Sequence, residues 1–133
     1  MNSKIVQYFI FLWMIISCIT VEGQKKSGWI AASSANSLKN PIAGNAASLK
    51  EAKTIYSTTC SPCHGEKGRG NGAASAALDP KPADHSSAAT QAQTDGAIYW
   101  KLTEGRNPMP SYKAMLTDAQ RWGLVNYIRT LKR

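Results

Sequence analysis

Two cysteines and a histidine lie close together in the string CSPCH, which occupies residues 60–64. Cys60 and Cys63 are two of the three cysteines in the 133-residue chain, and His64 is one of its two histidines. Side chains of these types could form a redox-active dithiol, supply part of a zinc site, or attach a haem through two thioether bonds. The rest of the chain helps to choose among these three chemistries.

The sequence offers little to complete the first two sites. A structural zinc ion needs four ligands, and after Cys60, Cys63 and His64 only His85 remains as a side chain of the right type. A thioredoxin-like dithiol needs a βαβ context, and no strand-like alternation is found. Thiols at positions i and i+3, however, can reach two vinyl groups on one edge of a porphyrin, with the next residue over the metal. We therefore predict that Cys60 and Cys63 bind one haem covalently and that His64 is an axial iron ligand.

A helix is predicted directly before this string. Ser48 can cap it, and Glu51 can reach back to form a capping box. The apolar residues that follow at helical spacing share one face: Leu49, Ala52, Ile55 and Tyr56. The helix should run close to Cys60 and so position the string.

Irregular backbone is predicted on both sides of a second helix. The segment at 64–87 is rich in glycine and proline, which allows no long regular element and one short turn around 73–78. Thr94 can cap a helix from Asp95 to Thr103, and Gly105 can end it. The string RNPMPSYK then interrupts regular structure again.

The last helix has the clearest signals. Thr117 and Gln120 form a capping box, and Asp118 suits the positive end of the helix dipole. Its buried face consists of Trp122, Val125, Ile128 and Leu131. The folded domain is therefore predicted to be all-α over residues 48–133. Because its irregular middle offers mainly small residues to a core, a large flat cofactor would supply buried surface that the chain lacks.

The first residues resemble an export signal. Lys4 precedes an apolar run from Ile5 to Ile19, and charge returns at Glu22. We expect residues 1–23 to be this signal, with cleavage before Gln24. Two alternatives stay open: a lipoprotein signal that ends before Cys18, which would then carry lipid, and an uncleaved anchor. All three place the folded part outside the cytoplasm, in the periplasm, either soluble or tethered to a membrane surface.

Residues 24–47 are rich in small and polar side chains and show no period, so we predict a flexible tether, with Trp29 or Pro41 as possible points of contact with the domain. The chain has a formal net charge of +8. Because the lysines and arginines are scattered and the chain looks exported, we expect protein partners with acidic surfaces and no nucleic acid.

Four strings together resemble the class I c-type cytochromes, small bacterial proteins with a single haem. They are CSPCHGEKGRGNG, LDPKPADH, TDGAIYWKLTEGRNPMPSY and DAQRWGLVNYIRTL. The resemblance covers residues 39–133 and implies the cytochrome c fold, in which helices surround one covalent haem c and the first and last helices cross. It also implies that His64 donates its second ring N–H to a carbonyl near a proline, with Pro80 or its neighbours as candidates.

The resemblance further implies a methionine as the second axial ligand. Met109 matches best, because Pro108 and Pro110 fix the backbone on either side of it. Met115 is the rival, but its position beside the start of the last helix favours a packing role. His85 is the other alternative, although its place after Asp84 favours an exposed loop histidine.

These assignments predict a single-electron carrier rather than an enzyme. With His64 and Met109 on opposite sides of iron, no coordination position stays open for a substrate. Two alternatives differ in class. One is a tethered cytochrome subunit of a larger oxidoreductase complex, and the other is a haem peroxidase or gas sensor in which Met109 is displaced.

Overall fold

The computed structural model describes residues 28–133, and the predictions for the signal at 1–23, including Cys18, lie outside this part. The described residues form helices and no β-strand, as expected. In chain order they are η1 (Ser33–Ser37), α2 (Ala46–Ile55), η2 (Tyr56–Cys60), α3 (Ser61–His64), η3 (Ser75–Ala77), α4 (Ala88–Gln91), α5 (Asp95–Glu104) and α6 (Asp118–Thr130). None of the helices within 28–133 has the length and apolar character needed to cross a membrane.

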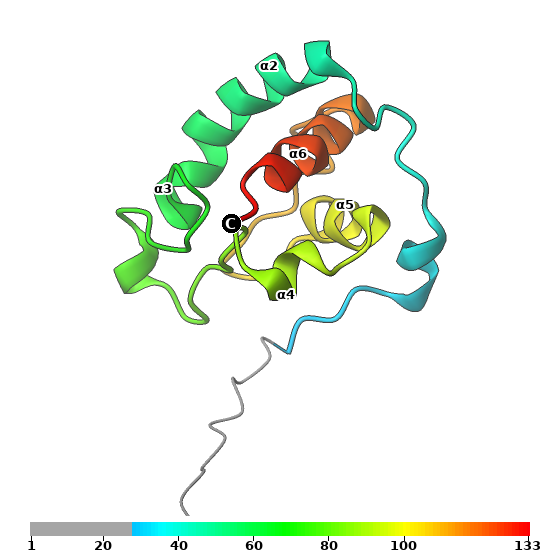
Figure 1. Ribbon diagram of the computed structural model, residues 1–133. Helices are drawn as coiled ribbons and strands as arrows, with labels where there is room; N and C mark the ends of the chain where they lie inside the picture. Colours follow the sequence, from blue (N-terminus) through cyan, green and yellow to red (C-terminus); the bar gives the residue numbers. More distant parts are fainter. Residues whose placement is uncertain (1–27) are drawn as a thin grey trace, which may run out of the picture.

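Helix α6 lies between α2 on one side and α5 on the other (Figure 1). Its inward face is the centre of the core, where Leu124, Val125 and Ile128 are essentially fully buried together with Tyr56 of η2. Trp122 adds a flat surface, because its ring stacks on Tyr99 of α5 at a centroid distance of 4.0 Å. The predicted apolar faces of the three main helices therefore meet one another.

The first helix begins earlier than the sequence analysis predicted. The cap is Asn45 and not Ser48, since the Asn45 side chain accepts a hydrogen bond from the Ser48 backbone N–H at 3.1 Å. Asparagine is as good a cap as serine, and the alanines that follow it favour helix. Glu51 consequently has another use: its carboxylate accepts a hydrogen bond from Gln120 of α6 at 2.8 Å.

The helix then continues through CSPCH with one wide turn. The segment η2 is a π-helical turn that joins α2 to α3 without a break. Turns of this type are rare and occur frequently at functional sites. This one buries both Tyr56 and Cys60, so it turns the start of the CSPCH string toward the interior.

The caps predicted for the other two helices are confirmed. The Thr94 hydroxyl accepts from the Ala97 N–H at 3.0 Å, and Gly105 ends α5. Thr117 and Gln120 form both hydrogen bonds of the capping box that starts α6. Helix α4 and the turn η1 were not predicted, whereas η3 falls within the predicted short turn at 73–78.

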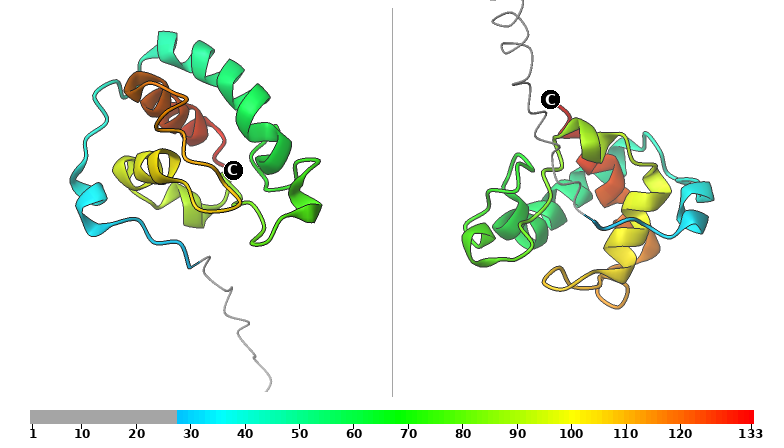
Figure 2. Two further views of the ribbon diagram at one scale, coloured as in Figure 1. Left: turned by 180° about the vertical axis from the view of Figure 1, so that it is seen from behind. Right: turned by 90° about the horizontal axis from the view of Figure 1, so that it is seen from below.

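A flexible tether was predicted for residues 24–47. The structure differs, because residues 29–45 pack against α5 and α6 (Figure 2). Ala35 of η1 is 1% exposed. It lies so close to α5 that a Cβ on Gly96 would stand 1.9 Å from the Ala35 carbonyl oxygen. Asn40 also donates to the side chains of Asp95 at 3.3 Å and Asn126 at 2.7 Å. The small and polar composition therefore reflects close packing and side-chain hydrogen bonds.

Candidate haem site

The two cysteines of CSPCH differ in their surroundings. Cys60 is buried and Cys63 is half-buried, and both are free thiols. Burial, and after it the neighbouring Cys63, raises the pKa of the Cys60 thiol to about 12. A redox-active dithiol needs a lowered thiol pKa, so that the thiolate can attack. The raised pKa therefore disfavours Cys60 as the attacking thiol in disulfide exchange.

One ring nitrogen of His64, Nδ1, forms a hydrogen bond within the protein, and the other, Nε2, is left to bind a metal. Its Nδ1 lies 2.9 Å from the carbonyl oxygen of Ala83, which accepts the ring N–H. Burial lowers the pKa of His64, against the opposing effect of this hydrogen bond. The ring is therefore neutral, with its proton on Nδ1 and the lone pair on Nε2. This is the state of a histidine that ligates a metal.

The carbonyl that accepts from His64 belongs to Ala83, which follows Pro82 directly. A carbonyl near a proline was expected here, with Pro80 or its neighbours as the candidates. Residues 70–74, earlier in the same irregular segment, are held beside α3 by backbone hydrogen bonds. Gly70 N–H donates to the His64 carbonyl at 2.8 Å, and Gly72 N–H donates to the Cys63 carbonyl at 3.0 Å. These bonds also satisfy carbonyls that the end of α3 leaves free.

One cavity is lined by all four predicted site residues: Cys60, Cys63, His64 and Met109. It contains about 1290 Å³ of empty space, part of which is open to solvent. Its remaining wall is mainly apolar and includes Leu78, Pro80, Pro82, Ile98, Leu102 and Tyr112. The donor set and the apolar wall fit a haem bound through two thioethers.

Met109 reaches the cavity from a tight turn. Arg106 and Met109 exchange backbone hydrogen bonds of 2.9 and 2.8 Å, which close the turn around Pro108. Met115 is 59% exposed and is not among the residues that line the cavity. Its predicted packing role is therefore wrong, because its side chain points into solvent. Of the two methionines, only Met109 is placed on the cavity wall.

His85 also differs from its prediction. The expected exposed loop histidine is 9% exposed, and its ring stacks on His64 at a centroid distance of 4.0 Å. Burial, and after it the neighbouring His64, lowers the pKa of His85, so the ring is neutral. Two axial ligands must approach a metal from opposite sides. A ring stacked on His64 lies on the same side, so the alternative of His85 as the second ligand is disfavoured.

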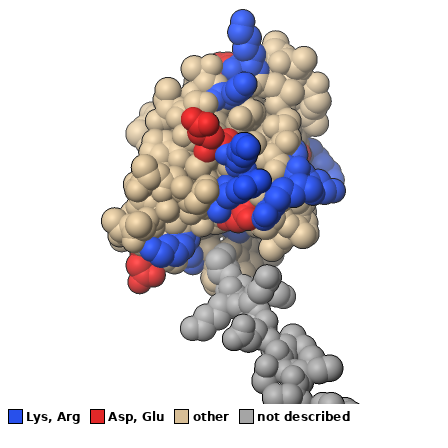
Figure 3. Space-filling view, turned by 60° about the vertical axis from the view of Figure 1, so that its left-hand side comes forward, with Lys and Arg blue, Asp and Glu red and all other residues tan. Residues whose placement is uncertain are grey.

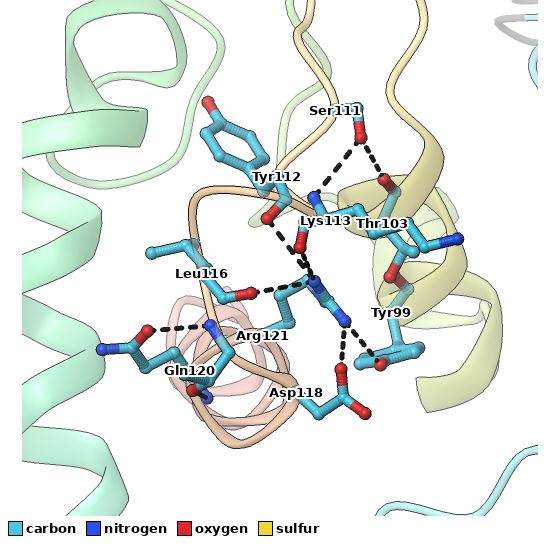
Figure 4. Close-up of polar contacts among 10 residues, drawn as sticks. Tyr99, Thr103, Ser111, Tyr112, Lys113, Leu116, Asp118, Gln120 and Arg121 are labelled. Carbon is cyan, nitrogen blue, oxygen red and sulfur yellow. Dashed lines mark hydrogen bonds and ion pairs between the residues drawn. The ribbon is translucent and has the colours of Figure 1, made fainter.

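The loop that carries Met109 is fastened to α6 by Arg121, which the sequence analysis did not single out (Figure 4). This side chain is 4% exposed. Its Nη1 donates to the carbonyls of Tyr112, Lys113 and Leu116 at 2.9–3.4 Å, and its Nη2 contacts Asp118 and the Tyr99 hydroxyl. The sequence contained a weak indication that Arg121 is structurally important. An arginine in the first turn of a helix interacts unfavourably with the helix dipole and therefore needs other partners.

A cluster of aromatic and basic side chains borders the cavity. Trp29, Lys101 and Arg106 all line it. The Lys101 ammonium lies 5.5 Å and the Arg106 guanidinium 5.1 Å from the centroid of the Trp29 ring, within the range of cation–π attraction. The prediction that Trp29 touches the domain is confirmed, since its ring also lies 6.5 Å from that of Trp100. The edge of the cavity is thus basic.

A helical chain around a cavity lined by a C-x-x-C-H string is the arrangement of a c-type cytochrome domain. The family model described as "Cytochrome C oxidase, cbb3-type, subunit III" matches residues 47–128. The chain belongs to this family of cytochrome c domains, whose members carry a covalent haem c and transfer electrons.

Among solved structures, the chain is similar to one in the reducing HAO-like protein complex of Kuenenia stuttgartiensis, with a TM-score of 0.63 and 28% sequence identity. The match covers 72% of this chain and 50% of the other, so it spans half the length of that protein. No curated protein matches the chain.

Proposed function

We propose that this chain is a single-electron carrier with one haem c, in which Cys60 and Cys63 form the thioethers and His64 and Met109 are the axial ligands. The observation that carries the proposal is the convergence of these four side chains on one cavity, with His64 Nδ1 already bonded to Ala83. Each thiol would add its sulfur to one carbon of a vinyl group and its hydrogen to the other. No atom is lost in this step.

The haem would supply an iron that changes oxidation state by one electron. His64 contributes a neutral nitrogen and Met109 a soft thioether, a pair that raises the reduction potential relative to two histidines. The apolar wall would exclude water from a bound haem. Because both axial positions would be filled by this chain, the expected reaction is outer-sphere transfer at the cavity edge.

The ligand assignment is tested by exchanging each methionine. In Met109→Leu, the oxidised protein should lose the near-infrared charge-transfer band of sulfur-bound iron, and the reduced protein should bind carbon monoxide readily. Met115→Leu is the matched control and should retain the band, because Met115 lies outside the cavity. A Met109→Leu protein that keeps the band would exclude Met109 as the ligand.

A second candidate is a tethered subunit of a larger oxidoreductase complex. Two comparisons favour it: the family description refers to an oxidase subunit, and the similar solved structure is part of a protein complex. Isolation of the native protein from membranes under mild conditions distinguishes the two. A subunit would co-purify in a constant ratio with an oxidoreductase, whereas a free carrier would elute alone.

We further propose that the partners present acidic docking surfaces. Figure 3 shows one face on which lysine and arginine side chains gather with a few acidic ones among them. Lys81, Lys101 and Arg106 line the cavity itself, so positive charge stands beside the proposed haem edge. Charge complementarity of this kind mainly speeds association.

The proposal also includes export, with residues 1–23 as the signal and the folded haem domain outside the cytoplasm. Attachment to a membrane surface would follow from lipid on Cys18 or from an uncleaved signal. The mass of the mature protein distinguishes these forms, because cleavage before Gln24 and lipidation of Cys18 leave different chains.

A further inference from the structure

A second histidine ring lies flat against the ring of His64. The centroids of His64 and His85 are 4.0 Å apart and the planes differ by 17°. The two residues come from different parts of the chain, α3 and the irregular segment after it. The proposed ligand role of His64 uses its Nε2 and its bond to Ala83, and leaves this contact unexplained.

His85 is held in place by groups on three sides. Its backbone N–H donates to the Gly68 carbonyl at 2.6 Å, and its carbonyl accepts from the Gln91 side chain at 2.8 Å. Its ring Nδ1 lies 3.0 Å from the hydroxyl of Tyr56, a residue with no exposed surface. Such a ring has little freedom to rotate or to leave.

The hydroxyl of Tyr56 fixes the tautomer of His85. This hydroxyl also lies 3.3 Å from the Gly65 carbonyl oxygen, which can only accept. The Tyr56 hydroxyl can form both hydrogen bonds at the same time if its O–H donates to the Gly65 carbonyl and its oxygen accepts from the Nδ1–H of His85. The π-face of His85 lies against the ring of His64.

His64 is thereby constrained at its edge and at its face. Ala83 and His85 belong to the same short segment, two residues apart. The Ala83 carbonyl fixes the direction of the Nδ1–H bond. That bond alone allows the ring to rock about the line of the hydrogen bond, whereas a flat neighbour at 4.0 Å prevents it.

We propose that His85 is a positioning residue, which sets the orientation of the His64 ring plane through this stack and is itself locked by Tyr56. The inference rests on the proposed ligation of iron by His64. A fixed ring plane would keep the orientation of the His64 ligand the same in both oxidation states, so little rearrangement of this ligand would accompany electron transfer.

Three variants of the haem-loaded protein test this role. His85→Leu removes the flat ring, His85→Phe restores a flat ring without its polar atoms, and Tyr56→Phe removes only the hydroxyl that locks His85. The readouts are the electron paramagnetic resonance g values of the oxidised protein and the hyperfine-shifted proton signals of the His64 ring. Both depend on the orientation of the ligand ring, and a general loss of stability does not move them.

We expect His85→Leu to shift and broaden the g values, His85→Phe to restore values close to the wild type, and Tyr56→Phe to broaden them less than His85→Leu. Wild-type spectra in His85→Leu would overturn the inference. If His85→Leu fails to fold or to retain haem, Tyr56→Phe provides the test in its place. Unchanged spectra in Tyr56→Phe would then overturn the inference. Failure of the proposed function looks different, because the wild-type protein itself would then show no histidine-ligated haem.

Discussion

At the scale of single residues, burial and local backbone structure determine the state and position of each side chain of the candidate site. Burial raises the pKa of the Cys60 thiol and lowers the pKa of His64, and the tight turn at Arg106 holds Met109 at the cavity wall. The identities and spacing of these residues were readable in the sequence. The burial of His85 was not, because it depends on Tyr56 and Gly68, which lie far from it along the chain.

Gly68 leaves the space that the buried His85 side chain needs. It has a φ of +69°, and a Cβ there would stand 2.9 Å from the Cβ of His85 and 2.8 Å from Leu131. Gly44 has a similar φ of +73° but nothing within 4 Å. Gly44→Ala should therefore cost about 1–2 kcal/mol through backbone strain alone.

Gly68→Ala should cost the same strain plus about 1–3 kcal/mol from overpacking against His85 and Leu131. Denaturant unfolding of the two variants measures the difference directly. Equal losses of stability in both variants would show that the space around Gly68 is not as tight as the structure indicates.

At the scale of elements, capping residues and apolar spacing predicted α5 and α6 well, since both signals are local. The start of α2 was misplaced because Asn45 and Ser48 are both good caps and only packing chooses between them. The turn η1 and the packing of residues 29–45 were missed for a physical reason. Their contacts are Ala35 on Gly96 and Asn40 on Asn126, which leave no periodic pattern in the sequence.

The segment that carries Ala83 and His85 is tied through Asp84 to Arg133, which lies beyond the end of α6. The Asp84 carboxylate accepts from the Ser86 N–H at 2.8 Å and hydroxyl at 2.6 Å, and pairs with Arg133 at 2.5 Å. Burial alone would raise the pKa of Asp84, but the bonds from Ser86 and the charge of Arg133 lower it below 3.8. A lowered folded-state pKa means that the stabilisation is present above pH 3.8 and is lost as pH falls through the folded-state value.

Asp84→Asn should accordingly lower the free energy of unfolding at pH 7 by about 1 kcal/mol, a modest figure because the pair is partly solvated. The difference from the wild type should shrink as the pH falls below 3.8. Urea unfolding at several pH values measures this. A difference that is independent of pH would show that the ionised carboxylate is not what stabilises the segment.

At the scale of the whole molecule, the formal net charge of +8 and the basic edge of the cavity predict how the protein reacts with charged redox partners. Oxidation by anionic hexacyanoferrate should slow as ionic strength rises, and oxidation by a cationic cobalt complex should accelerate.

Lys101→Gln should lower the rate with the anion at low salt by a few-fold more than Lys132→Gln does. Lys101 lines the cavity, whereas Lys132 lies in the exposed C-terminal residues beyond α6. Stopped-flow kinetics with both oxidants provides the comparison. If the two variants behave alike, the effect belongs to overall charge and not to the cavity edge.

The central claim, a haem joined to this chain by Cys60 and Cys63, is tested most directly by the intact mass of the purified protein after extraction with acidified organic solvent. We predict that the wild-type polypeptide retains the mass of one haem and its colour through the extraction, and that the Cys60→Ala, Cys63→Ala double variant does not. A wild-type chain that emerges at the mass of the bare polypeptide would contradict the account.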